Sequence, residues 1–232
     1  MQIVVSHLTR MNPGYICVAG LDVKSGKHVR PVLGRRLGTE LLRKNGGVFA
    51  VGAIVDLGPT SKAAAAPEVE DHQFSIANVK FLRTAKANEF WDAVRGIAKT
   101  TFAAIFGPSL IAHGGPCAVD VGTGTASLGC LTLPAGSVLE VDPWNKIRMR
   151  LNDGTFAPSL SVTDIRLYED DQKTPREKLI TMIARRLKDE NVLLSVGLAR
   201  PWKKPGDTEP RHWLQANNLH LESDPLGLRV FS

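Results

Sequence analysis

Three basic side chains on one predicted strand are the strongest candidates for a binding role. Lys146, Arg148 and Arg150 alternate with apolar residues, and successive side chains on a strand point to opposite faces. One face of this strand is therefore entirely cationic. Cations neutralise the phosphates of nucleic acid, and Trp144, just ahead of them, is placed to stack on a base. The pattern favours a nucleic-acid-binding strand, with an ordinary solvated face as the alternative.

A second basic and aromatic segment lies in a predicted loop near the C-terminus. The run Arg-Pro-Trp-Lys-Lys-Pro places Trp202 between Arg200 and the pair Lys203 and Lys204. Stacking on an aromatic side chain contributes about 1–3 kcal/mol per base, so this mixture is typical of contact with a single strand. Arg211 extends the same predicted surface. The alternative is that Trp202 folds back to cap the core.

Further basic side chains gather around predicted loops of the N-terminal part and on one later strand. They are Arg10, His28, Arg30, Arg35, Arg36, Arg43, Lys44 and Arg166. Binding through such residues depends strongly on salt, because each neutralised phosphate releases counterions. All of them except Arg43 and Lys44 join the predicted nucleic-acid contacts. A plain soluble surface is the alternative.

Clustered carboxylates are the main catalytic candidate. Asp164, Glu169, Asp170 and Asp171 are of the type that holds a divalent cation in nucleases. The run also precedes a predicted helix, where acidic residues are favoured by the helix dipole. No Gly-x-Ser-x-Gly, Walker, His-Glu-x-x-His or Cys-x-x-Cys motif occurs. The sequence therefore predicts no catalytic residue, no metal and no cofactor, and leaves a metal-dependent nuclease as a less favoured alternative.

Composition limits the class of protein. The 232 residues are 43% hydrophobic and 22% charged, which is typical of a globular chain, and the net charge of +6 favours anionic partners. The basic excess lies toward both ends and the middle is acidic. No apolar run reaches the roughly 20 residues that cross a bilayer, so we expect no membrane role and a cytoplasmic location. The three cysteines lie in apolar segments, which predicts buried thiols.

The elements that position these residues are mainly strands. Short runs rich in β-branched and apolar residues, bounded by Gly, Pro, Asn or Asp, predict them. The predicted strands cover residues 2–8, 14–23, 28–33, 51–57, 74–82, 117–121, 127–133, 147–151, 161–168, 192–198 and 212–221.

Two helices are also predicted. Asn88 can cap the first, and apolar residues recur at helical spacing until Gly107 and Pro108 end it. Thr174 followed by Pro175 begins the second, which has its own apolar stripe.

Each half of the chain therefore has several strands in meander order and one helix before its last strands. The Pro-Ala-Gly sequence at residues 134–136 marks a candidate domain boundary. The fold class that matches is mainly β with two helices, arranged as two tandem OB-like barrels. Residues 1–135 form the first, with an inserted helix, and residues 136–232 form the second.

Motifs in three parts of the chain are similar to those of a known family. They are residues 7–10 with 18–22 and 28–31, residues 160–168, and residues 195–201 running on to 211–218. Together they resemble a bacterial family of dual OB-containing domains, over nearly the whole chain. Its members are regarded as nucleic-acid binders and are sometimes associated with defence or mobile-element systems. The resemblance implies a fold and a binding class, and no catalytic residues.

The sequence thus predicts an accessory protein that binds nucleic acid, with single-stranded DNA or RNA favoured, beside a separate enzyme. One alternative is a protein-interaction module whose basic faces meet an acidic partner. The metal-dependent nuclease is the other.

Overall fold

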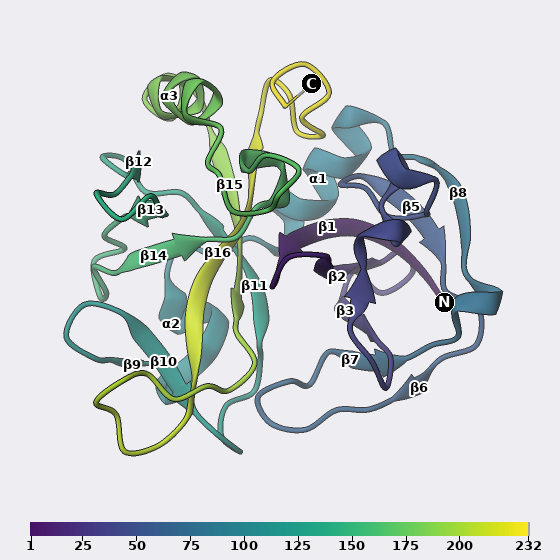
Figure 1. Cartoon of the computed structure of the whole chain (residues 1–232), viewed down its shortest axis with the longest axis horizontal. Helices are drawn as coiled ribbons and strands as arrows, with labels where there is room; N and C mark the ends of the chain where they lie inside the picture. The colour runs from purple at the N-terminus through teal and green to yellow at the C-terminus, as the bar shows by residue number, and fades with distance from the viewer. Residues whose placement is uncertain (232) are drawn as a thin grey trace.

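Strands dominate the computed structural model, which describes residues 1–231 (Figure 1). They form two eight-stranded sheets, each mixing parallel and antiparallel pairs. The first sheet contains β1 (Gln2–Arg10), β2 (Tyr15–Asp22), β3 (His28–Val32), β4 (Leu37–Gly38), β5 (Ala53–Asp56), β6 (Ser61–Lys62), β7 (Asp71–Gln73) and β8 (Lys80–Thr84). The second contains β9 (Ile111–Ala112), β10 (Cys117–Asp120), β11 (Leu128–Thr132), β12 (Val138–Val141), β13 (Ile147–Arg150), β14 (Ser159–Val162), β15 (Val192–Leu198) and β16 (Arg211–Leu221).

Five strands of the first sheet have the order of an OB-fold. β1, β2 and β3 form an antiparallel meander, β5 pairs antiparallel with β1, and β7 pairs parallel with β3. β2 and β3 pair antiparallel because the short turn at residues 24–27 joins them directly. A parallel pair such as β3 and β7 needs a longer connection. We call these five strands the first unit.

Five strands of the second sheet repeat that order. β12, β13 and β14 form the meander, β15 pairs with β16, and β16 lies parallel to β14. Helix α3 (Glu177–Arg186) connects the third and fourth of these strands. We call them the second unit. The predicted class of two OB-like domains in a mainly β chain is confirmed, and Figure 1 shows the first unit on the right and β12–β14 on the left.

Alternating burial confirms the predicted faces of β13. Ile147 and Met149 are fully buried, while Arg148 and Arg150 point away from the core. The apolar residues of this unit pack with Leu160 and Val162 of β14 into one cluster. Burying each such side chain stabilises the fold by about 1.5–3 kcal/mol, which fixes the register of the strand.

The helices depart from the sequence prediction. The expected helix from Asn88 to Gly107 is two helices, α1 (Ala87–Ile97) and α2 (Phe102–Phe106), so that residues 1–231 contain three. The helix breaks because Lys99 pairs with β11: its N–H donates to Cys130 O at 2.9 Å and its carbonyl accepts from Thr132 N at 2.8 Å. Tertiary strand pairing thus overrides a continuous helical pattern.

No α-helix lies between β3 and β5 of the first unit. Two 3-10 turns, Thr39–Leu41 and Arg43–Asn45, fill the connection between β3 and β5, and α1 follows the unit's last strand. The second unit alone has an α-helix in that place.

One predicted strand ends early and another begins late. The segment predicted at 161–168 leaves the sheet after Val162 and turns into a 3-10 helix at Ile165–Leu167, because the Asp164 carboxylate accepts from Arg166 N at 3.1 Å. The segment predicted at 74–82 contains a 3-10 turn at Ile76–Asn78 before β8 begins. Local side-chain hydrogen bonds of this kind compete with strand pairing.

Sheet membership bears on how the chain divides. β9, β10 and β11 precede residue 134, yet β10 pairs with β16 and β11 pairs with β15 of the second sheet. A division by sheets therefore falls between β8 and β9. The boundary at residue 135 stays a prediction.

The cysteines form no disulfides among themselves. All three cysteines are free; Cys117 and Cys130 are buried and Cys17 is half-buried, and burial raises the pKa of Cys130 to about 12. Among the described residues no helix is long and apolar enough to span a membrane.

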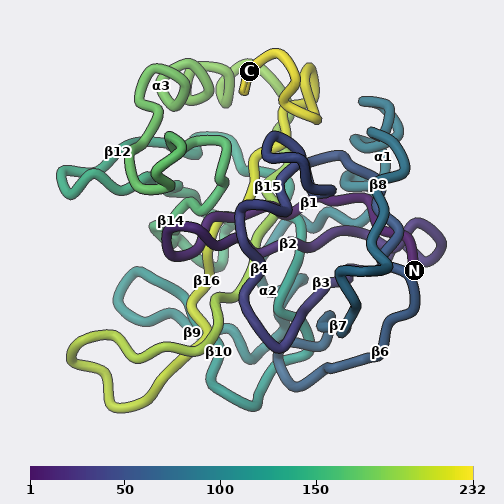
Figure 2. The backbone as a smooth tube through the Cα atoms, turned by 45° about the vertical axis from the view of Figure 1, so that its right-hand side comes forward, coloured from purple at the N-terminus to yellow at the C-terminus, as the bar shows by residue number. Residues whose placement is uncertain are grey.

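The two units pack together along β1 and β16. Asn218 Oδ1 accepts from Leu8 N at 2.7 Å and its amide donates to Leu8 O at 3.3 Å. This side chain therefore makes the two backbone hydrogen bonds that a neighbouring strand would make at Leu8. Ser195 Oγ donates to Ser6 O at 3.2 Å beside it. Figure 2 shows the N-terminal strand running into the second sheet at this place.

Two buried histidines, His7 and His220, and the half-buried His28 lie at or near this junction. The rings of His7 and His28 are 5.3 Å apart, and His220 packs on Phe90 at 5.1 Å. Burial lowers the pKa of His28 to about 4 and that of His220 to about 3, and it lowers the pKa of His7 well below its usual value. All three are therefore neutral in the folded protein at pH 7.

Acid should weaken the junction. Because the folded pKa values lie below the unfolded value near 6.5, the unfolded chain binds protons first, and stability is full above pH 6.5 and falls as pH drops toward 4. Each histidine contributes a slope of up to about 1.4 kcal/mol per pH unit. Urea unfolding at pH 7.5 and 5.0 measures this. His28→Gln should reduce the slope, and equal free energies of unfolding at both pH values would contradict the prediction.

Candidate nucleic-acid interface

A groove of about 650 Å³ lies on the outer face of the second unit. β13, β14 and β16 form its floor, and the β12–β13 and β15–β16 loops form its walls. These are the places where an OB-fold binds oligonucleotides: the face of its second and third strands and the loops between strands one and two and between strands four and five. The residues that carry its chemistry are Trp144, Arg148, Ser161, Trp202, Lys204 and Trp213.

Strand register places the floor residues side by side. Arg148 lies opposite Ser161 on β14, and Ser161 lies opposite Gln215 on β16. Their neighbours Met149 and Ala216 are fully buried in the core, so these three side chains face outward. Arg148 Nη1 donates to Ser161 Oγ at 2.7 Å, which holds the guanidinium against the floor.

A hydrogen-bonded turn presents Trp144. Asp142 Oδ1 accepts from the backbone N–H groups of Trp144 and Lys146, both at 2.9 Å, and Asn145 adopts the left-handed conformation with φ of 59°. The indole of Trp144 is 77% exposed. An exposed ring of this size at the edge of the groove makes Trp144 a candidate contact.

Trp202 stands on Trp213 in the opposite wall. Their rings are 6.4 Å apart, and Trp213 Nε1 donates to Trp202 O at 3.2 Å. Trp213 is buried, whereas Trp202 is 45% exposed. Lys204 Nζ lies 3.2 Å from the centre of the Trp213 ring. Trp202 therefore lines the groove and does not fold into the core.

The charges of the groove are nearly balanced. Arg148 pairs with Asp142 at 2.8 Å and Arg150 pairs with Glu140 at 2.9 Å. Burial raises the pKa of Asp142, but hydrogen bonds from Arg148 and two backbone N–H groups outweigh it and lower the pKa overall. Burial lowers the pKa of Lys204, as does the nearby charge of Arg148. Aromatic surface, more than net positive charge, distinguishes this site.

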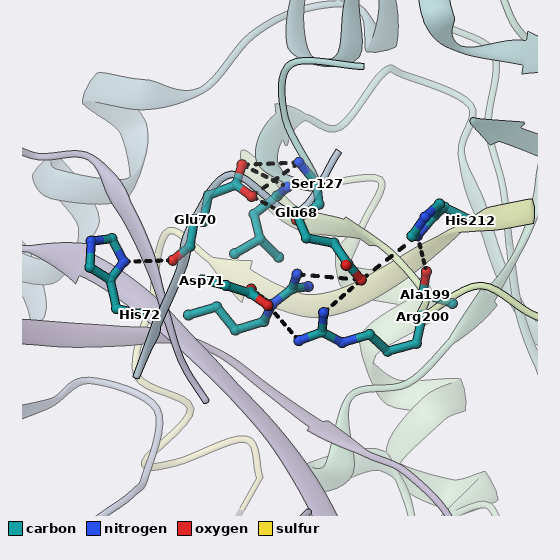
Figure 3. Close-up of polar contacts among 10 residues, drawn as sticks. Glu68, Glu70, Asp71, His72, Ser127, Ala199, Arg200 and His212 are labelled. Atoms are coloured by element: carbon teal, nitrogen blue, oxygen red, sulfur yellow. Dashed lines mark hydrogen bonds and ion pairs between the residues drawn. The ribbon is translucent and has the colours of Figure 1, made fainter. Parts of the chain in front are cut away.

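Arg30 and Arg200, predicted as nucleic-acid contacts, instead join the two units. Arg30 Nε lies 2.5 Å from Asp71, while Arg200 bonds Asp71 at 2.7 Å and Glu68 at 2.7 Å. Figure 3 shows the carboxylates of Glu68 and Asp71 turned toward the Arg200 guanidinium. Arg30 is only 3% exposed, so it has no surface to offer a phosphate. We call these four residues the ion network.

Other predicted contacts are also engaged within the protein. Arg166 makes two hydrogen bonds to Asp164. Arg10 lies 4.1 Å from the centre of the Tyr168 ring. Arg211 pairs with Asp120 at 3.0 Å. The other member of this group is His28, which packs on His7.

The remaining predicted residues divide by position. Arg35 and Arg36 are exposed on the first unit, away from the groove, with Arg36 5.6 Å from the Tyr15 ring. Lys146 and Lys203 are exposed and adjoin groove residues in the chain. The structure thus brings together Arg148, Trp202 and Lys204 with Trp144, and it leaves the N-terminal cations apart. These contacts stay predictions.

Sequence reasoning allowed that Trp213 could extend the basic surface but did not count it among the contacts, and it did not single out the floor residue Gln215. A tryptophan within a strand is more often core, and Trp213 is indeed buried. The signal was the alternation on β16, where Leu214 and Ala216 enter the core and Trp213 and Gln215 share the other face.

Three of the four carboxylates of the nuclease alternative have partners within the protein. Asp164 is fully buried and bonds Arg166, Asp170 pairs with Lys44, and Asp171 accepts from Thr174. Within residues 1–231 no three His, Cys, Asp or Glu side chains are grouped as metal ligands would be.

The family model of the dual OB-containing domain matches residues 1–219. This chain belongs to that family. The match covers both units and nearly all of the chain, so the predicted family is confirmed together with the fold. No curated protein and no solved structure was found to match the chain.

Replacing Arg30 should test its role in the ion network. Arg30→Ala leaves the buried carboxylate of Asp71 and the half-buried carboxylate of Glu68 with one partner fewer, so we expect the free energy of unfolding to fall by about 3–5 kcal/mol. Arg95→Ala removes an exposed pair with Asp92 and should cost less than about 1 kcal/mol. Urea denaturation of both variants measures the difference. Small losses of unfolding free energy, equal in the two variants, would contradict a stabilising role for Arg30 in the ion network.

Proposed function

We propose that this dual OB-containing domain protein binds single-stranded nucleic acid in the groove of the second unit. The observation that carries the proposal is the convergence of Trp144, Trp202 and Trp213 with Arg148 and Lys204 on the face an OB-fold uses for oligonucleotides. The family match supports an OB module, and OB-folds commonly bind nucleic acids.

Stacking favours single strands over duplex. Two exposed indoles, Trp144 and Trp202, flank a floor of polar side chains that suits a sugar-phosphate chain or the edge of a base. Bases inside a duplex are already stacked on each other, while those of a single strand are open to an aromatic partner. DNA and RNA both meet this requirement.

The exposed indoles favour nucleic acid over the alternative of an acidic protein partner. Both partners are anions and Arg148, Arg150 and Arg211 are each paired with a carboxylate, so stacking on Trp144 and Trp202 is what favours nucleic acid. A role beside a separate enzyme and a cytoplasmic location are further parts of the proposal. So is a place in a bacterial defence or mobile-element system, which rests on the family resemblance.

Removing either exposed indole should weaken binding. We expect Trp144→Ala and Trp202→Ala each to raise the Kd for a labelled 12-nucleotide single strand by about 5- to 100-fold, since one stacked base contributes about 1–3 kcal/mol. Fluorescence anisotropy measures this, with a matched duplex as the comparison. Tyr15→Ala, which removes an exposed ring of the first unit, is the control and should bind like the wild type. Tighter binding to duplex, or no binding at low salt, would refute the proposal.

Salt should affect binding only moderately. Because the groove cations are largely paired, we expect few phosphate contacts, and Lys203→Gln should reduce the slope of log K against log salt by about 0.7, the value of one contact on a single strand. Lys24→Gln, in an exposed turn of the first unit, should leave the slope unchanged. Anisotropy titrations from 50 to 300 mM NaCl, roughly the range where counterion release is measured, give both slopes. A slope that is unchanged in Lys203→Gln removes this residue from the interface.

A further inference from the structure

We infer that the chain holds one site for a single strand and not two, because the binding face of the first unit is the surface on which the second unit is docked. The ligand is then a short single strand or an overhang held by one OB unit, not a long strand laid across both. This inference rests on the proposed function.

Register identifies the corresponding face of the first unit. His7 lies opposite Ala19, and Thr9 lies opposite Cys17, so these four residues share one face of β1 and β2. On β3 the core residue Val29 separates His28 from Arg30, which puts both on the outer face too. These six residues form the outer face of the first unit.

Four of the six residues of this face are buried and the other two, Cys17 and His28, are half-buried, whereas the matching face of the second unit is open. His7 is 2% exposed, Ala19 1% and Arg30 3%. In the second unit the side chain of Arg148 is 31% exposed, and Trp144 stands in solvent. The same sheet position is thus closed in one unit and accessible in the other.

Residues of the second unit cover the closed face. Asn217 Nδ2 donates to His7 Nδ1 at 3.1 Å, and Thr9 forms a β-bridge with Asp164. Arg30 shares Asp71 with Arg200, which comes from the β15–β16 loop. A nucleic-acid strand would have to displace all of these contacts to reach the sheet.

The β1–β2 loop of the first unit is also tied down. Gly14 N donates to Gln172 Oε1 at 2.6 Å, and the Gln172 amide donates to Tyr15 O at 3.2 Å. Gln172 is only 4% exposed and adopts φ of 57°, so the surrounding structure holds it in place.

The β5–β7 loop is held from the other side. The Glu70 carboxylate accepts from Ser127 N at 3.0 Å, Ser127 Oγ at 2.6 Å and Leu128 N at 3.3 Å (Figure 3). The equivalent loop of the second unit, between β15 and β16, carries the exposed Trp202. Both loops that flank an OB binding face are therefore open in the second unit and occupied in the first.

A double variant distinguishes one site from two. Trp144→Ala combined with Trp202→Ala removes the exposed rings of the groove without touching the core, and its Tm should match that of the wild type. Anisotropy is measured with an 8-nucleotide and a 30-nucleotide strand, lengths on the order of one OB site and of two. With one site, both strands lose at least 10-fold in affinity and by the same factor.

Binding of the long strand gives the result that would overturn the inference. A variant that loses the short strand but keeps the long one within about threefold of the wild type would show a second face and overturn the inference. Wild-type protein that binds neither strand would remove the proposed function, and this inference with it. Lys24→Gln combined with Lys27→Gln, in the exposed β2–β3 turn of the first unit, is the control and should bind both strands like the wild type.

Hydrogen exchange with the wild type gives a second readout. On adding the 8-nucleotide strand we expect protection in the loops at 142–146 and 199–210, and unchanged exchange in β2 and β3. New protection in β2 or β3 at a comparable level would contradict a single site.

Discussion

The ion network between Arg200 of the second unit and the two carboxylates Glu68 and Asp71 of the first is the contact on which the candidate site depends. Arg200 precedes Trp202 by two residues, and it fixes the base of the loop that forms one wall of the groove. His212 strengthens this anchor, since its Nδ1 lies 3.0 Å from the carbonyl oxygen of Ala199. Buried charges are stable only when paired and hydrogen-bonded, so the network requires both units to be docked. The first unit thus acts as the support for a loop of the second.

This arrangement gives the two OB units different roles. The outer face of the first is buried in the junction, where Asn218 bonds both polar backbone groups of Leu8. The outer face of the second keeps its polar floor and its exposed rings. Because Arg148 already bonds Asp142 and Ser161, its position is set before any ligand arrives. Little side-chain entropy is then lost on binding.

The sequence predicted features that depend on neighbouring residues. Alternation identified the faces of β13, and the basic and aromatic run around Trp202 identified a wall of the groove. It failed where the deciding partner lies far along the chain. Arg30 and Arg200 looked like phosphate contacts because Asp71, their partner, is 41 and 129 residues away.

The helix expected from Asn88 to Gly107 shows the same limit. Its apolar spacing is helical on both sides of the break, and only the pairing of Lys99 with β11 interrupts it. The cations of β13 also looked unpaired in the sequence, since no local pattern shows that the side chain of Glu140 on the adjacent strand forms an ion pair with Arg150. Pairing across strands is a property of the fold.

The tryptophans offer the most direct measurement. The chain has four, so a ¹H–¹⁵N spectrum of uniformly labelled protein resolves four indole signals that single substitutions assign. Trp144 and Trp202 lie in the open groove, whereas Trp91 is buried on α1, outside the groove. On titration with a short single strand, the indole signals of Trp144 and Trp202 should move in proportion to binding while that of Trp91 stays in place. Saturating strand that leaves both groove signals unmoved, or that shifts Trp91 as far as Trp202, would contradict a binding site in the groove of the second unit.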